Sequence, residues 1–165
     1  MAATLLAYLP KPFAVLAASS LMDTVGRRGL LLYNLPIMGA CLALLSCTFT
    51  LMPANSIWRA VAAVLGTSFF SIAFSFSLGP IPNIISSELL PSDARSLGMS
   101  LSVGVQWLFS AMLVYVFPIL THKFGTQTMI AFFASMCVLA WFFTKAFVPE
   151  TAGKSLEESS AMASD

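Results

Sequence analysis

The sequence has few charged residues, and this shortage excludes a soluble globular protein. Asp, Glu, Lys and Arg make up 9% of its 165 residues, whereas hydrophobic residues make up 58%. Soluble domains carry about a quarter charged residues. The mean hydropathy of +0.89 also lies far on the apolar side of such domains. We therefore expect an integral membrane protein.

Neither sign of charge is in excess. Eight Lys and Arg residues stand against seven Asp and Glu residues, and none of them forms a long block of one sign. A protein that binds nucleic acid needs a basic face. The composition therefore argues against a nucleic-acid partner.

Residue patterns for metal binding and catalysis are missing as well. The cysteines Cys41, Cys47 and Cys137 lie inside apolar runs without paired or metal-type spacing, so we interpret them as small buried hydrophobic residues. The single histidine, His122, lies in a predicted outer loop, where a solvated side chain is expected. Nucleotide-binding loops and nucleophile–base pairs are not recognisable. We expect no enzyme activity, no metal and no cofactor.

Long apolar runs dominate what is present. A charged residue at the centre of a membrane helix costs about 2.5–3.5 kcal/mol, and about 20 apolar residues cross the hydrocarbon core, so gaps between charges mark candidate spans. Besides four long uncharged runs, a weaker candidate span extends from about Thr4 to Met22 and is interrupted by Lys11. We predict an all-α membrane protein with about five transmembrane helices, with a charged loop at 23–28 and another turn at 121–125. The long uncharged runs cover residues 29–58, 60–87, 96–121 and 124–144.

One of these spans ends in a sequence that a continuous helix does not tolerate. Pro80 and Pro82 follow Gly79, and each proline removes a backbone donor and clashes with the preceding turn. A helix must therefore be broken or bent here, and a charged hinge over residues 88–95 follows. Broken helices next to charged hinges are typical of transporters, because free helix ends offer polar groups to a solute. The wall of a channel is also compatible with this motif.

The basic residues predict the orientation in the membrane. Short cytoplasmic loops carry the excess of Lys and Arg, and alternating loops put five basic residues on one side and two on the other. We therefore place the 23–28 loop, the 88–95 hinge and the C-terminus in the cytoplasm. Residues 1–150 are then a helical bundle, and residues 151–165 are a polar tail. The five are Arg27, Arg28, Arg95, Lys145 and Lys154, and the two are Arg59 and Lys123.

Acidic residues lie at the same predicted depth as three of these arginines. Charges at a membrane interface favour partners, and ion pairs between separate helices break when those helices move apart. We predict that Glu88, Arg95, Arg27 and Glu150 form one cytoplasmic network that holds this side closed. Ordinary interfacial anchors that only set the topology are the alternative. The residues at this depth are Asp23, Glu88, Asp93 and Glu150 with Arg27, Arg28 and Arg95.

Three motifs in register point to one family. They lie at 23–28, 80–95 and 149–158, and read Asp-x-x-Gly-Arg-Arg, Pro-x-Pro followed by Glu-x-x-Pro-x-x-x-Arg, and Pro-Glu-Thr-x-Gly-Lys-Ser-Leu-Glu-Glu. In order and spacing they resemble the C-terminal half of the sugar porters of the major facilitator superfamily. The resemblance makes the chain equivalent to helices eight to twelve of a twelve-helix fold, with the eighth incomplete. The phrases at 21–23 and 79–84 are most similar to plant vacuolar (tonoplast) monosaccharide transporters.

The resemblance implies a sugar site on the broken span and on the helix after it. Phe74 and Trp107 match aromatic positions that face the sugar in the family. Asn83 stands where many members have Trp, and Gln106 stands where many have Asn. Aromatic faces cover the C–H side of a sugar ring, and amides donate to and accept from its hydroxyls. Ser75 replaces an acidic residue of some members, which leaves a role in proton coupling open.

The resemblance also implies transport of a monosaccharide, either facilitated or coupled to protons, through a vacuolar or plasma membrane. The partners it implies are the sugar, the lipid bilayer and the N-terminal half of the transporter, with protons in the case of a symporter. One wall of a central cavity cannot give alternating access, so we expect a fragment that is inactive alone. The alternative is a non-transporting membrane fragment, inert or regulatory through association with full-length transporters.

Overall fold

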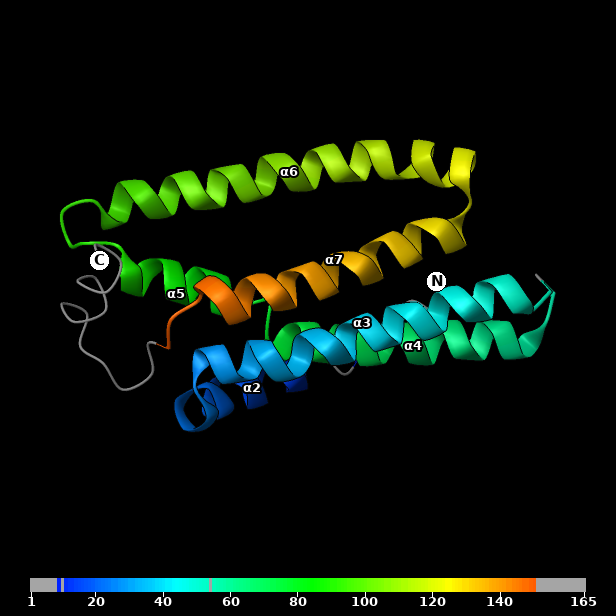
Figure 1. The fold of residues 1–165 in the computed structure, drawn as a ribbon, viewed down its shortest axis with the longest axis horizontal. Coiled ribbons are helices and arrows are strands. Elements are labelled where there is room, and N and C mark those ends of the chain that lie inside the picture. The colour runs from blue at the N-terminus through cyan, green and yellow to red at the C-terminus, as the bar shows by residue number, and fades with distance from the viewer. Residues whose placement is uncertain (1–8, 10, 54, 151–165) are drawn as a thin grey trace.

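The computed structural model describes residues 9, 11–53 and 55–150, apart from the side chains of Ser19, Ser20, Asp23 and Thr24. All regular secondary structure in these residues is helical, which confirms the all-α expectation, and the helices run lengthwise through the molecule (Figure 1). They are α2 (Lys11–Val25), α3 (Arg27–Leu51), α4 (Ile57–Phe76), α5 (Ile81–Leu89), α6 (Arg95–Phe124) and α7 (Thr126–Phe147).

Four segments of the described chain are long and apolar enough to cross a membrane. These are α3, α6, α7 and the segment Ile57–Leu89, in which α4 and α5 together make one span of 33 residues. Helix α2 has 15 residues, which is about 22 Å at 1.5 Å per residue and shorter than the hydrocarbon core. It occupies the place of the incomplete eighth helix, and the five segments agree with the predicted architecture.

Two predicted loops are much shorter than expected. Helix α2 continues to Val25 and α3 begins at Arg27, so the predicted loop at 23–28 shrinks to Gly26 alone. The turn predicted at 121–125 likewise shrinks to Gly125 between α6 and α7. The φ angles of the two glycines are 85° and 86°. Such angles reverse the chain within one residue, and glycine adopts them without the clash that a Cβ atom would cause.

The predicted break in the second of the four long spans is confirmed. Helix α4 ends at Phe76, and the Phe74 carbonyl accepts bonds from the backbone N–H groups of Ser77, at 3.2 Å, and Gly79, at 2.9 Å. Pro82 then lies in the first turn of α5, where the missing N–H has no helical partner to lose. The break therefore results from local chemistry around Gly79 and the two prolines.

Helix α3 packs against α7, α4 and α2, and α7 lies between α3 and α6 (Figure 1). A Cβ atom on Gly39 would lie 3.4 Å from Cβ of Cys137, so glycine allows α3 and α7 to approach closely. By contrast, no residue of α6 is buried, although α6 contacts both α7 and α5. One long apolar helix thus presents most of its surface outward. The buried core consists of Ala18, Met22, Leu30, Leu31, Leu35, Ile81 and Ile85, with Met38, Ala73 and Cys137 as a second cluster.

Candidate functional site

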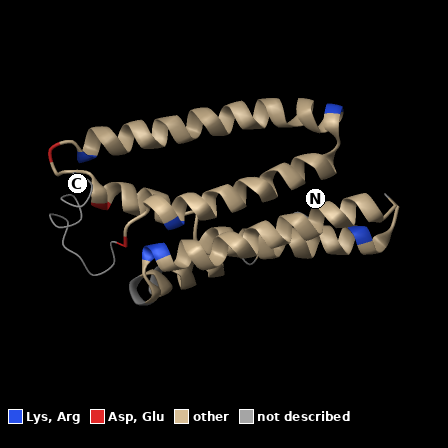
Figure 2. Ribbon diagram, in the orientation of Figure 1, with Lys and Arg blue, Asp and Glu red and all other residues tan. Residues whose placement is uncertain are grey.

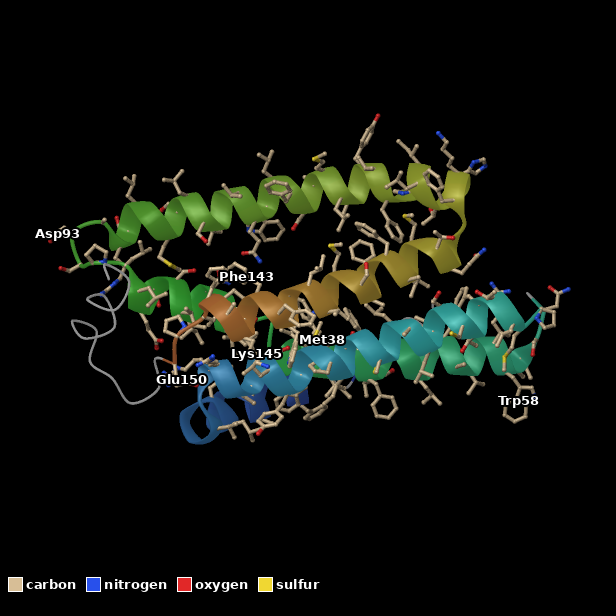
Figure 3. The ribbon with its side chains drawn as sticks, viewed as in Figure 1. Met38, Trp58, Asp93, Phe143, Lys145 and Glu150 are labelled. Carbon is tan, nitrogen blue, oxygen red and sulfur yellow. The ribbon has the colours of Figure 1, made fainter. Side chains whose placement is uncertain are left out.

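Charged side chains gather at one end of the bundle. Figure 2 shows the described acidic residues at the end where α3 and α6 begin and where α5 and α7 end. Glu150, Lys145 and Asp93 are labelled at this end in Figure 3, whereas Trp58 marks the opposite end. We call this end the charged end.

The carboxylate of Glu150 binds the N-terminus of α3. Its Oε1 accepts the backbone N–H of Arg27 at 3.1 Å, and its Oε2 accepts that of Arg28 at 3.1 Å. The first N–H groups of a helix have no partner within the helix and carry a partial positive charge, so a carboxylate satisfies both needs. A Cβ atom on Gly26 would lie 2.7 Å from Oε2 of Glu150. Glycine at this position thus leaves the space that the carboxylate occupies.

Two arginine side chains extend this contact to other helices. Nη2 of Arg27 lies 3.1 Å from Oε1 of Glu88 on α5, and the exposed fractions of the two side chains are only 19% and 15%. Nη2 of Arg28 donates to the backbone carbonyl of Lys145 at 2.9 Å, near the end of α7. The cluster therefore joins the start of α3 to the end of α5 and to the segment after α7.

Part of the hydrogen-bonding capacity of this cluster is unused. Within the described residues, Nε of Arg27, Nε of Arg28 and Oε2 of Glu88 are buried without a hydrogen-bond partner. Buried polar atoms of this kind cost about 1–3 kcal/mol each when they stay unpaired. A further polar group that bonds to one of these atoms would therefore stabilise the protein.

The remaining predicted members of the network lie elsewhere. Arg95 donates from Nε and Nη2 to the Leu90 carbonyl, at 3.4 and 3.2 Å, and forms no ion pair with a described residue. The prediction that Arg95 joins Glu88 and Glu150 is therefore wrong in this structure, since its guanidinium turns back to the hinge. Asp93 is exposed and accepts a bond from the Ser92 hydroxyl at 3.4 Å. Asp23 lies in α2, and its side chain is outside the described part.

The predicted sugar residues do not share one cavity. Phe74 precedes the helix break, stacks on Phe70 with 6.2 Å between ring centroids, and lines a cavity of about 830 Å³ between α3, α4, α6 and α7. Every side chain that lines this cavity is apolar, so it offers no group to a sugar hydroxyl. Asn83 is half-buried on α5, and Gln106 and Trp107 are exposed on α6, with Trp107 71% exposed. No described helix covers the surface that carries these two residues.

Two buried serines lie close to the break in the span, one in the last turn of α4 and one directly after it. Ser75 is buried, and its Oγ donates to the Ser71 carbonyl at 2.8 Å. Ser77 is also buried and donates to the Ala73 carbonyl at 2.8 Å. Both hydroxyls therefore satisfy the backbone of α4 itself. In the part of the chain that the structure describes, no group of His, Cys, Asp and Glu side chains could hold a metal ion.

Two residues at the charged end were not predicted as site residues. The Lys145 carbonyl anchors Arg28, and the Trp141 indole Nε1 donates to the Leu32 carbonyl on α3 at 3.2 Å. A sequence signal exists for them, because an aromatic residue four positions before a lysine in the last turn of a span is typical of a membrane interface.

Comparison with known proteins decides the family. The family described as "Sugar (and other) transporter" matches residues 1–163. The chain belongs to this family of sugar porters. Plastidic glucose transporter 4 of Arabidopsis thaliana is 35% identical over 96% of this sugar porter chain, and Monosaccharide-sensing protein 1 of Arabidopsis thaliana is 34% identical over 87%. These relatives are transport and sensing proteins by name, and membership of the family identifies a multi-pass integral membrane protein that is not an enzyme.

Solved structures show the same relationship in three dimensions. The inward-open xylose transporter XylE from E. coli superimposes with a TM-score of 0.82 and 28% identity over 97% of the chain. The proton:xylose symporter XylE bound to 6-bromo-6-deoxy-D-glucose gives a TM-score of 0.84. The sugar porter chain spans 29% and 20% of the two plant relatives and 35% of XylE. The described helices therefore correspond to about a third of a major facilitator transporter.

Proposed function

We propose that this chain is the C-terminal portion of a porter that carries a monosaccharide, either by facilitated transport or coupled to protons. The observation that carries the proposal is the broken span, in which Asn83 follows the break at residues 77–80. Discontinuous helices near the middle of the membrane form the solute sites of such transporters. Relatives named for glucose and xylose support a monosaccharide as the solute.

The polar face of the sugar site lies on α5 and α6. Asn83 and Gln106 supply amide donors and acceptors for hydroxyls, and Trp107 supplies an aromatic face for the C–H side of a ring. Gln106 lies 11 residues after the first residue of α6, which is about 16 Å at 1.5 Å per residue and close to the middle of a 30 Å core. Phe74 contributes packing behind the break rather than a direct contact, because it faces the apolar cavity.

A partner portion must supply the opposite wall. Gln106 and Trp107 are exposed on this chain, so a sugar bound to them alone would remain open to its surroundings. Transport needs a second wall that closes over the sugar from the other side. We therefore expect the chain alone to be inactive, and we expect activity when the N-terminal portion of a related transporter is present.

The cluster at the charged end then acts as a gate. Arg27 and Glu150 connect α3 to α5 and to the segment after α7, and this contact is available only while these elements stay close. Interactions of this kind typically bias a two-state equilibrium by about 1–3 kcal/mol. Ser75 carries no titratable carboxylate, so proton coupling would need an acidic group elsewhere in the transporter.

Transport by a reassembled protein tests the proposal. The chain is co-expressed with the N-terminal portion of Plastidic glucose transporter 4, and uptake of labelled glucose and xylose is measured in liposomes. We expect uptake from the pair and none from either part alone. Replacing Trp107 or Gln106 by alanine should weaken sugar affinity by about 1–3 kcal/mol, which is about 5- to 150-fold.

Phe109→Ala is the matched control, because Phe109 is an exposed aromatic residue on the same helix, two positions after Trp107. It should leave the affinity unchanged. Uptake by the chain alone would refute the need for a second wall. Unchanged sugar affinity in both Trp107→Ala and Gln106→Ala would refute the site.

A regulatory fragment is the second candidate. The absence of buried residues along α6 favours it, because an apolar helix without cover can associate with the helices of another transporter. In that case the chain should lower or raise uptake by an intact relative in the same liposomes. Uptake that does not change at any ratio of the two proteins contradicts this role.

A further inference from the structure

A second hollow of the molecule lies on its outer surface, along the seam between α3 and α7. Its volume is about 580 Å³, within the range of about 300–1,000 Å³ typical of ligand sites. Val138 and Phe142, which line it, are 52% and 58% exposed, so the groove opens to the surroundings of the bundle. Its walls include Pro36, Ala40 and Ala43 of α3 and Val138, Trp141 and Phe142 of α7.

Small side chains on α3 create this space. Ala40 and Ala43 are exposed and fill little volume, while Gly39 between them and Pro36 lets the two backbones approach. The one hydroxyl in the lining belongs to Ser135, and it donates to the Phe132 carbonyl at 2.7 Å. The groove therefore offers an apolar surface whose polar group is already satisfied.

A basic residue lies where this groove meets the charged end. Val138, Trp141 and Lys145 follow one another at intervals of three and four residues, so they lie on one face of α7. The Lys145 Nζ lies 5.1 Å from the centroid of the Trp141 ring, and the Trp141 indole is held by its bond to the Leu32 carbonyl. Figure 3 shows Lys145 at the charged end of α7, near the start of α3.

The length of the groove matches one leaflet of a bilayer. Ala134, its first lining residue on α7, precedes Lys145 by 11 residues, about 16 Å along the helix. Half of the hydrocarbon core measures about 15 Å. A single acyl chain whose head group lies at Lys145 would therefore extend along the whole groove.

The balance of charge around Lys145 favours an anionic head group. The side chains of the cluster carry three positive charges, on Arg27, Arg28 and Lys145, and two negative charges, on Glu88 and Glu150. Glu88 is paired with Arg27, and the Glu150 carboxylate accepts the two N–H groups of α3. Lys145 forms no ion pair with a described residue, and its ammonium group lies over the Trp141 ring. Among the described side chains of this cluster, one positive charge is therefore in excess near the mouth of the groove.

We propose that the seam between α3 and α7 binds an anionic phospholipid of the leaflet at the charged end, with one acyl chain in the groove and the phosphate at Lys145. This site is separate from the sugar residues on α5 and α6, and it does not depend on transport. Bound lipid would cover the seam next to the Arg28 contact with the Lys145 carbonyl and stabilise it. The gate would thereby respond to the lipid composition of the membrane.

Native mass spectrometry of the purified full chain tests the proposal. The chain is equilibrated in micelles with equal amounts of phosphatidylglycerol and phosphatidylcholine of identical acyl chains. We expect phosphatidylglycerol to be retained about fivefold more, the ratio that one basic residue gives at an anionic surface. Lys145→Gln should abolish this preference.

Lys123→Gln is the matched control for the charge. Lys123 lies in the last turn of α6 at the opposite end, and its Nζ also lies over an aromatic ring, 5.6 Å from the centroid of Phe124. This variant should keep the fivefold preference. Equal retention of both lipids by the unmodified chain, or an equal loss in Lys123→Gln and Lys145→Gln, would overturn the proposal.

Filling the groove tests the acyl chain. Ala40→Phe and Ala43→Leu should lower retention of both lipids by about tenfold or more, the equivalent of about two buried methylene groups. Ala111→Phe on the exposed surface of α6 should not, and circular dichroism selects the variants that remain helical. Unchanged retention in a folded filled variant overturns the proposal. A lipid-free dimer that the filled variants dissociate would assign the groove to a second copy of the chain and would also overturn it.

Discussion

Glu150 is predicted to stabilise the fold from outside any helix. It lies after the end of α7, yet its two carboxylate oxygens hold the first two N–H groups of α3, 123 and 122 residues away in sequence. Replacing it by alanine leaves both donors without this partner. Because Arg27 and Arg28 are half-buried rather than fully buried, solvent replaces part of the loss.

The loss of unfolding free energy in Glu150→Ala can be calculated from the two hydrogen bonds that the carboxylate accepts. A bond to a charged group contributes about 1.5–3 kcal/mol, and removal of an N-cap acceptor costs about 0.5–2 kcal/mol. We take about 1 kcal/mol for each half-buried bond, so Glu150→Ala should lower the free energy of unfolding by about 2 kcal/mol. Asp93→Ala is the control, because its carboxylate is exposed at the same end and accepts a long bond from the neighbouring Ser92 hydroxyl. That change should stay within about 0.5 kcal/mol.

A substitution at Gly26 tests the same carboxylate contact through its coupling with Glu150→Ala. Its φ of 85° and ψ of 156° cost a residue with a Cβ atom about 1–3 kcal/mol. The Cβ of Gly26→Ala would also lie 2.7 Å from Oε2 of Glu150, so the carboxylate must leave and its bonds weaken. In the Glu150→Ala background only the backbone cost remains. The two substitutions should therefore be non-additive by about 1–2 kcal/mol, and the double variant should be more stable than the sum predicts.

The assay is reversible unfolding of the chain in mixed micelles with increasing denaturing detergent, monitored by tryptophan fluorescence and helical circular dichroism. Trp141 bridges α7 and α3 and reports on the contact that the Glu150 segment closes. Additive costs for Gly26→Ala and Glu150→Ala would show that the carboxylate does not occupy the position next to Gly26. A loss no larger than that of Asp93→Ala would refute the capping role itself.

Three further predictions concern packing, gating and topology. Gly39→Leu should destabilise the chain by about 1–3 kcal/mol because it separates α3 from α7, whereas Gly104→Ala should not, because the space around its Cβ position is open. Equal unfolding midpoints of the two variants would contradict the packing prediction. In the reassembled transporter, Arg27→Ala should open the charged end and increase the labelling rate of a cysteine engineered there, whereas Arg59→Ala should leave that rate unchanged. Identical labelling rates in the two variants would count against the gate. Cysteines introduced at Asn55 and Ser159 should react with impermeant reagents from opposite sides of the membrane, with 159 on the cytoplasmic side, and reaction from one side only would refute the topology.

The class of the protein and the positions of its spans could be predicted from the order of residues alone. A charge inside a bilayer costs several kcal/mol, so the gaps between charged residues report directly where helices cross. The break around Pro80 and Pro82 was also predictable, because a proline disrupts a helix through its own ring and missing N–H, whatever packs around it. The order and spacing of three motifs were enough to indicate the sugar porter family.

Which charged residues contact one another could not be predicted before the helices were seen packed together. Arg27 and Arg95 are both candidates for Glu88 in sequence, but Arg27 makes the ion pair while Arg95 binds the Leu90 carbonyl. The cap of α3 by Glu150 and the short connection at Gly26 both depend on that glycine. Its positive φ turns the chain within one residue, and its missing Cβ atom leaves room for a carboxylate from the far end of the chain. Contacts of this kind are fixed by how whole helices pack, and hydropathy and motif spacing describe each helix separately. For the same reason the groove beside Lys145 could not be predicted, because its walls come from both α3 and α7, which approach each other at Gly39.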